Sequence, residues 1–297
     1  MPSAEFENLV QMFKAQRTGV EPTIPELRTG FDMLGQMMPV AEGVQIEETT
    51  LGGLPTDRLK KPDADESRAL LYLHGGGYCI GTRASHRPVT AALAKATGIP
   101  VLLPEYRLAP EAPFPAAVED ARTVYEALLE TYPPERIVVA GESAGGGLTA
   151  ALLVNLRDEA RPLPAAAVVI SPWCDLTGLG DVSDVALATD FLTPEVLVVF
   201  AANYAADESD RMLPLCSPGL ADLAGLPPLL VLAGANEILC SQDERLAARA
   251  KEQGVDVTLE IEPDMFHAWT LFTLLPEAQA TITRIASYVQ EHVPVLA

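Results

Sequence analysis

One stretch constrains the fold of this chain more than any other. It runs from Ile137 to Gly147 and reads Ile-Val-Val-Ala-Gly-Glu-Ser-Ala-Gly-Gly-Gly. The apolar run predicts a buried strand and the following Leu148 to Leu153 predicts a helix, so Gly-Glu-Ser-Ala-Gly forms a sharp turn between them. Gly141 and Gly145 carry no side chain, which lets strand and helix approach closely. Ser143 is expected at the apex of the turn, beside a helix N-terminus, as in a nucleophile elbow.

Charge and cysteine content exclude several classes of partner. The 297 residues are 48% hydrophobic and 21% charged, which allows one large α/β domain or two small ones. The formal net charge of -21 argues against nucleic acid or anionic membrane as a partner, because like charges repel. The four cysteines show no C-x-x-C spacing, so we expect buried free thiols and no metal site.

The N-terminal segment carries acidic residues where a secretory signal would be basic and then apolar. Glu5 and Glu7 are the first charged side chains, and no apolar stretch of roughly 18 residues or more occurs in the chain. We therefore expect a cytoplasmic protein without membrane insertion.

Strands and helices alternate along most of the chain. The expected strands are Ala69 to Leu73, Ile99 to Leu103, Ile137 to Ala140, Ala165 to Ile170, Pro228 to Ala233 and Val255 to Ile261. The expected helices between and after them are Ser85 to Ala96, Pro115 to Glu130, Ala144 to Asp158, Ser241 to Gln253 and Pro276 to His292. Before them, Val44 to Leu59 is expected to form an antiparallel edge hairpin that turns at two glycines. This order predicts an α/β fold, a mostly parallel sheet with helices on both faces.

Two segments do not fit the alternation. Residues 1–43 hold a helical apolar pattern followed by prolines and a methionine-rich piece, and they are too short to fold alone. Residues 176–215 contain Thr193 and Pro194, an N-cap and first-turn pair for an apolar helix from Glu195 to Tyr204. We expect the first segment to pack on the rest and the second to lie over the C-terminal edge of the sheet.

A serine nucleophile needs a base within hydrogen-bond reach. The four histidines are His74 in a glycine loop, His86 at a helix start, His292 near the C-terminus and His267 after the final strand. Loops at the carboxyl edge of an open α/β sheet build its sites, and Ser143 lies at that edge. His267 is therefore the candidate base.

The group that orients the base should come from the loop after the strand Pro228 to Ala233, and two carboxylates compete there. Ser241 and Glu244 have the spacing of a capping box, which would begin the helix at Ser241 and place Asp243 in its first turn. An acid in a first turn has a sufficient structural role. Glu237 lies in the loop itself, and we favour it over Asp243 while the choice stays open.

The glycine loop is the candidate oxyanion hole. Gly75, Gly76 and Gly77 follow His74 directly after a predicted strand, and three glycines in a row leave backbone N–H groups free to converge. Gly76, Gly77 and Ala144 are the expected donors, and Gly75 could substitute for one of them. His74 is expected to shape the loop by hydrogen bonding to backbone. A phosphate-binding loop is the alternative, but the Lys and Ser/Thr of a P-loop are missing.

These motifs together resemble the hormone-sensitive-lipase-like family of bacterial carboxylesterases within the α/β-hydrolase fold. The resemblance rests on His74-Gly75-Gly76-Gly77-Tyr78, Tyr106 to Glu111 with Pro113 to Ala117, Gly141 to Gly146, Ser171-Pro172-Trp173 and His267. It implies an eight-stranded sheet, a helical cap from residues 1–43 and 176–215, a catalytic domain from residues 44–175 and 216–297, and ester hydrolysis without a cofactor. Many members carry Asp-Pro-Leu where this chain has Glu237-Ile238-Leu239, and this alignment also selects Glu237.

The resulting hypothesis is a serine carboxylesterase for short acyl esters, with Ser143, Glu237 and His267 as the catalytic triad and a small-molecule ester as substrate. An amidase with the same triad and a hydrolase-fold protein that binds ligand without turnover are the alternatives. The resemblance also implies dimers through the last strand, Val255 to Ile261. The candidate acyl-pocket residues are Phe13, Met33, Met37, Met38, Phe191, Leu192 and Val196.

Overall fold

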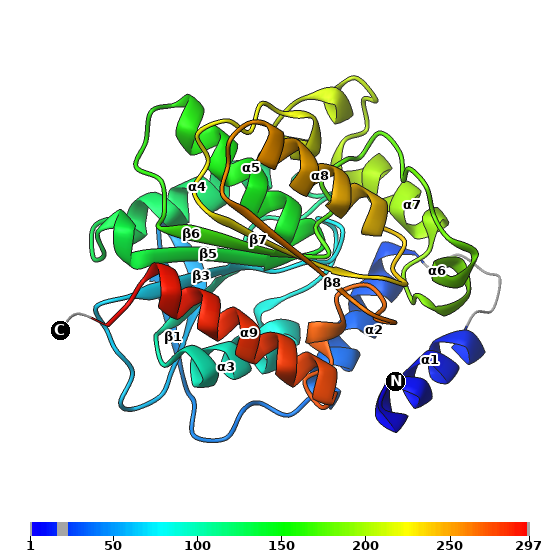
Figure 1. Ribbon diagram of the computed structural model, residues 1–297, viewed down its shortest axis with the longest axis horizontal. Coiled ribbons are helices and arrows are strands. Elements are labelled where there is room, and N and C mark those ends of the chain that lie inside the picture. The colour runs from blue at the N-terminus through cyan, green and yellow to red at the C-terminus, as the bar shows by residue number, and fades with distance from the viewer. Residues whose placement is uncertain (1, 17–22, 296–297) are drawn as a thin grey trace.

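The central element is one eight-stranded sheet, seen in a computed structural model that describes residues 2–16 and 23–295 (Figure 1). The strands are β1 Gln45–Leu51, β2 Leu54–Lys60, β3 Ala69–Leu73, β4 Val101–Pro104, β5 Ile137–Glu142, β6 Ala166–Ile170, β7 Leu229–Gly234 and β8 Val257–Glu262. Their order is β1-β2-β4-β3-β5-β6-β7-β8, and β2 runs antiparallel to both of its neighbours while β3 to β8 are parallel. The predicted fold class and the predicted edge hairpin are confirmed.

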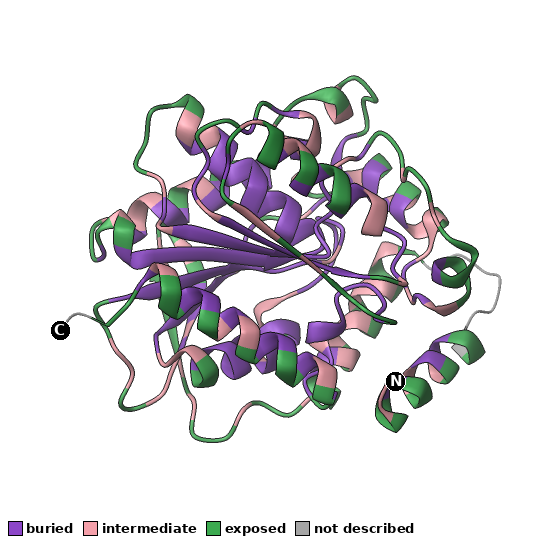
Figure 2. Ribbon diagram, in the orientation of Figure 1, coloured by how far each residue is buried: buried purple, intermediate pink, exposed green. Residues whose placement is uncertain are grey.

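Helices cover both faces of the sheet (Figure 1). One face carries α3 Arg83–Thr97 and α9 Pro276–His292, and the other carries α4 Ala116–Leu128, α5 Ala144–Asp158 and α8 Cys240–Glu252. Figure 2 shows the inner strands buried along their length, and every residue of β3, β5, β6 and β7 is buried. A parallel strand covered on both faces needs a continuous apolar run, which explains why these strands do not alternate in sequence.

The helices outside this alternation lie at the carboxyl edge of the strands. They are α1 Ala4–Gln16, α2 Ile24–Met37, α6 Asp184–Thr189 and α7 Pro194–Tyr204. Thr193 caps α7 by accepting the backbone N–H of Val196, as the sequence predicts. In α1, the ring of Phe6 stacks on that of Phe266 with centroids 4.9 Å apart, so this segment packs on the rest as expected.

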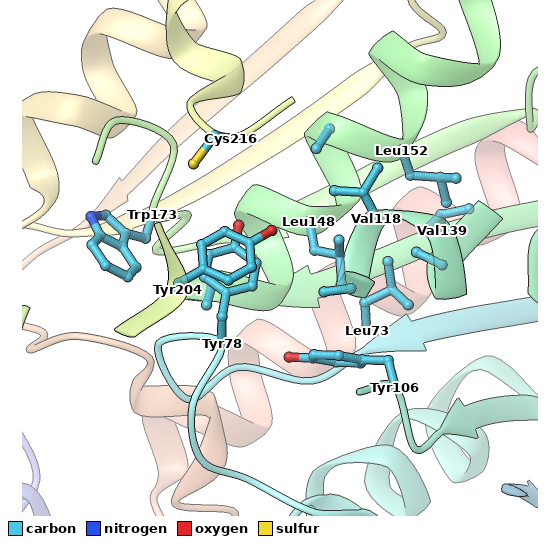
Figure 3. Packing of buried hydrophobic residues seen from close by; sticks show 14 of the residues in the cluster. Leu73, Tyr78, Tyr106, Val118, Val139, Leu148, Leu152, Trp173, Tyr204 and Cys216 are labelled. Atoms are coloured by element: carbon cyan, nitrogen blue, oxygen red, sulfur yellow. The ribbon is translucent and has the colours of Figure 1, made fainter. Parts of the chain in front are cut away.

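A buried aromatic cluster joins α7 to the glycine loop that follows β3 (Figure 3). The rings of Tyr78 and Tyr204 stack with centroids 3.8 Å apart and planes only 5° from parallel. Tyr78 follows the third glycine of the loop, and Tyr204 is the last residue of α7. Stacking of two fully buried rings fixes the loop relative to the helix above it.

Two local expectations differ from the structure. The helix α2 is not predicted, because prolines and methionines mask its pattern. Pro25 occupies the first turn, where proline is tolerated, and Glu26 accepts the N–H of Thr23.

The predicted capping box at Ser241 is wrong. The helix α8 begins at Cys240, and the Ser241 hydroxyl donates to the carbonyl of Leu179 instead.

Candidate active site

Ser143 lies at the turn between β5 and α5, where the sequence predicts it. Its φ of 55° and ψ of -125° are unusual for a residue with a side chain, as expected for the apex of a nucleophile elbow. A Cβ at Gly141 would collide with the backbone of Gly145, and a Cβ at Gly145 would collide with the carbonyl of Leu73. The two glycines are therefore required for the approach of strand and helix.

The hydroxyl of Ser143 lies against the imidazole of His267. The distance between Ser143 Oγ and His267 Nε2 is 2.8 Å, and both residues are buried. Burial lowers the pKa of His267 to about 3, so the ring is neutral near pH 7. A neutral Nε2 that accepts the hydroxyl proton of a serine is the arrangement that a general base requires.

The loop that follows β7, called here the acid loop, places Glu237 near the second nitrogen of that ring. Glu237 Oε2 lies 3.8 Å from His267 Nδ1, whereas no ion pair joins Asp243 to His267 among the described residues. Asp243 is buried in the first turn of α8, and burial together with the Glu237 carboxylate raises its pKa well above the ordinary value. Burial raises the pKa of Glu237 as well, and the hydrogen bond from Asp243 acts against that shift.

Ser171 connects the acid loop to the base loop, a contact that the sequence reasoning missed. Its hydroxyl donates to Glu237 Oε2 and accepts the backbone N–H of Ala268 at 3.0 Å. The residue follows β6, is fully buried and has a φ of 47°. The Ser-Pro-Trp motif is visible in the sequence, but only the fold reveals that its serine bonds to two residues that lie 66 and 97 positions further along the chain.

The glycine loop borders the same cavity. Gly76 and Gly77 have positive φ values of 111° and 59°, and their N–H groups donate to no acceptor within the described part of the chain. The N–H of Gly75 instead donates to Glu142 Oε1 at 2.5 Å. Gly75 is therefore withdrawn as a candidate donor, because its N–H already has a charged partner.

His74 makes the contacts expected of a loop-shaping residue. Its Nδ1 lies 2.8 Å from the carbonyl of Gly75, and its ring stacks on Tyr106 with centroids 4.2 Å apart. The Tyr106 hydroxyl donates to the carbonyl of His74 at 2.6 Å. Burial and the neighbouring His86 together lower the pKa of His74 to about 3, so the ring stays neutral.

A buried acid and base lie directly behind this loop and were not predicted from the sequence. Glu142 Oε1, which accepts the N–H of Gly75, is also 2.9 Å from His86 Nε2. Burial opposes the charge on His86, but the Glu142 carboxylate raises the pKa of the ring above its ordinary value. Glu142 is the variable position of the Gly-x-Ser-x-Gly motif, so the elbow also anchors the glycine loop.

The cavity above Ser143 has a volume of about 530 Å³ and a largely apolar wall. The apolar side chains that line it are Met12, Phe13, Leu27, Phe31, Met33, Leu34, Met37, Ile80, Phe191, Leu192, Val196, Leu197, Phe200, Ala268 and Leu271. Six of the seven predicted pocket residues are among them, whereas Met38 lines a separate small hollow beside α3. Gly76, Gly77, Ser143 and His267 form its floor.

None of the helices formed by residues 2–16 and 23–295 has both the length and the hydropathy to cross a bilayer. Over the same residues, no cluster of three histidine, cysteine, aspartate or glutamate side chains is arranged to bind a metal ion.

The eight-stranded sheet, its elbow serine and the buried imidazole define an α/β hydrolase. A family model described as alpha/beta hydrolase fold matches residues 70–271. The chain is 44% identical over 243 residues to an acetyl-hydrolase of Streptomyces hygroscopicus, with 81% of each chain covered. It is 35% identical over 260 residues to a carboxylesterase of Mycobacterium tuberculosis, covering 81% of this chain and 80% of that protein.

Solved structures extend the likeness to the whole chain. A crystal structure of an esterase from the bacterial hormone-sensitive lipase family superimposes with a TM-score of 0.93 at 39% identity, covering 99% of each chain. The chain therefore belongs to the α/β-hydrolase-fold family, as one of its hormone-sensitive-lipase-like carboxylesterases. It is a carboxylic ester hydrolase.

Proposed function

We propose that this enzyme hydrolyses short-chain acyl esters through an acyl-enzyme on Ser143, with His267 as base and Glu237 as the orienting acid. The observation that carries the proposal is the 2.8 Å contact between Ser143 Oγ and His267 Nε2 on the floor of an apolar cavity. His267 takes the hydroxyl proton as Ser143 attacks the ester carbonyl, and then gives it to the leaving alcohol. Water repeats the sequence on the acyl-enzyme.

The negative charge on the carbonyl oxygen needs fixed donors. We assign this role to the N–H groups of Gly76, Gly77 and Ala144, the last at the first position of α5, where N–H groups lack partners within the helix. A donor of this kind contributes about 3 to 4 kcal/mol of transition-state stabilisation in comparable sites. Glu237 stabilises the imidazolium that forms during each step.

The substrate class follows from the cavity. Helices α1, α2 and α7 supply most of its wall, which supports a cap from residues 1–43 and 176–215 over a catalytic domain from residues 44–175 and 216–297. A volume of about 530 Å³ holds a small ester with few polar partners. The name of the Streptomyces hygroscopicus relative, an acetyl-hydrolase, also supports a short acyl group.

The proposal is tested by initial rates on p-nitrophenyl esters of increasing acyl length, with Ser143→Ala measured beside the wild type. We expect rates that peak at short chains and vanish in the variant. An isosteric amide measured under the same conditions separates an esterase from an amidase. Undiminished turnover in Ser143→Ala would remove the whole assignment, and ligand binding without turnover would favour a non-catalytic role.

We also propose that β8 pairs with its counterpart in a second copy to form a homodimer. The strand is at the edge of the sheet, and its Leu259 and Ile261 are each 37% exposed. An exposed apolar edge strand favours pairing with another chain. Light scattering at micromolar concentration should give twice the mass of the chain, and a monomer there contradicts the proposal.

A further inference from the structure

Asp190 is a buried carboxylate in the inserted segment between β6 and β7. It follows α6 directly and is fully buried. Its Oδ1 accepts the backbone N–H of Leu192 at 3.2 Å and that of His267 at 3.3 Å, and its Oδ2 accepts the N–H of Ile238 at 2.9 Å. One side chain therefore contacts three separate points of the backbone.

Two of these points belong to the loops that carry the base and the acid. His267 is the base itself, and Ile238 is the residue next to Glu237. They lie 77 and 48 positions from Asp190 in the chain. The two oxygens of one carboxylate thus span the two loops whose separation determines how far Glu237 lies from the imidazole.

The third point belongs to the pocket wall. The N–H of Leu192 holds the turn that presents Phe191, whose ring lies 5.9 Å from the His267 ring and 5.3 Å from Phe13 of α1. Both Phe191 and Leu192 line the cavity. Asp190 therefore joins the wall of the acyl pocket to the two loops at its floor.

A carboxyl group suits this position because each of its two oxygens can accept a backbone N–H, whereas an amide would turn an NH₂ group toward one of those N–H groups. Burial raises the pKa of Asp190 to about 8, and the backbone N–H bonds act against that shift. Burying an acid costs free energy of folding, and the backbone contacts to both loops account for the presence of Asp190 here.

We propose that Asp190 is a positioning residue, which holds the His267 loop and the Glu237 loop at a fixed separation from within the inserted segment. The proposal rests on the proposed function of the triad. In this structure Glu237 Oε2 is 3.8 Å from His267 Nδ1, so a small shift of either loop changes the contact between acid and base. In other enzymes a displacement of about 1 Å costs about 100-fold in rate.

The test replaces Asp190 with the isosteric Asn. Asp184→Asn is the matched control, because Asp184 is an exposed carboxylate on α6 in the same segment. For Asp190→Asn on p-nitrophenyl acetate we expect kcat/KM to fall about 10- to 100-fold, mostly in kcat, with Asp184→Asn within twofold of wild type. Titration with a p-nitrophenyl phosphonate then counts the competent sites and gives their rate of reaction.

A positioning role predicts one reactive site per chain in Asp190→Asn, with a phosphonylation rate lowered by the same factor as kcat/KM. A wild-type rate at fewer sites means that Asp190 only supports folding, and this result overturns the proposal. An unchanged rate and site count, in Asp190→Asn and Asp190→Ala alike, overturns it as well. If the wild type itself fails to react at Ser143, the proposed function fails instead, so the two failures are distinguishable.

Discussion

The two halves of the active site are built in different ways. On the nucleophile side, Leu73 at the end of β3 pairs with Gly141 in β5, so the glycine loop and the elbow emerge from adjacent strands. On the other side, His267 and Glu237 come from the loops after β8 and β7, and they are joined through Ser171 and Asp190. The first half is made mainly from two short backbone turns on adjacent strands, with Glu142 bonding one turn to the other, and the second half is made from side-chain bridges between loops.

This difference explains how each half tolerates change. Glycine positions in the first half exclude any side chain, because a Cβ would collide with neighbouring backbone or with a packed ring. The second half depends on hydrogen bonds to buried polar groups, each of which can be removed singly. A single substitution in the first half should therefore remove most of the activity, whereas a single substitution in the bridges should lower the activity only in part.

The largest effect tests whether the two halves act as one unit. Ser143→Ala, His267→Ala and the double variant should each lower kcat by on the order of 10⁴ to 10⁶, because removal of either group disables the same proton transfer. The double variant should be no worse than the singles. Additive losses in kcat, measured with the p-nitrophenyl ester of best turnover, would break the idea of a shared step.

The next effect probes the backbone of the nucleophile half. Gly77 has a φ of 59°, and a Cβ there would collide with the ring of Phe200. Gly77→Ala should lose at least about 100-fold in kcat, since the loop would shift its donors from the oxyanion. Gly53→Ala is the control, because Gly53 has a φ of 84° and open space around its Cα. A loss of equal size in both variants would assign the effect to positive φ alone.

A smaller effect is expected at the bridge between acid and base. Ser171→Ala removes the donor to Glu237 and the acceptor of the Ala268 N–H. The buried groups left without partners should cost about 1 to 3 kcal/mol of stability, and kcat should fall about tenfold, far less than for the triad itself. Ser287→Ala, on the exposed side of α9, should change neither. Thermal unfolding and initial rates measure both quantities, and a loss as large as that of His267→Ala would contradict this ranking.

The mildest effect is a shift of the pH profile. Burial lowers the pKa of His267 to about 3, and the base works only when neutral. As pH falls from 8, kcat/KM should stay level through the ordinary histidine value of about 6.5 and decline only below it. This decline on the acidic side of the profile is measured by initial rates across that pH range, on an ester whose leaving group is pH-independent. A midpoint at or above 6.5 would mean that the imidazole is not kept neutral by burial.

Much of the fold follows from local patterns. The helices α5 and α9 have the predicted bounds, 144–158 and 276–292, because each begins and ends at clear signals around a periodic apolar run. The helix α2 escaped prediction, since two prolines and a methionine-rich stretch do not reveal a helix that is held by packing. The capping box at Ser241 failed because the chain offered that serine a tertiary partner instead.

By itself the sequence determined the elbow and the glycine loop and pointed to His267 as the candidate base, because contiguous glycines, a strand and a helix encode backbone geometry over a few residues. Only the tertiary structure decided that Gly75 donates to Glu142, that Glu237 faces the imidazole, and that Asp190 contacts the loops of Glu237 and His267. These contacts join residues 30 to 77 positions apart. A hydrogen bond between such distant groups depends on where the whole sheet brings them, and no local pattern records it.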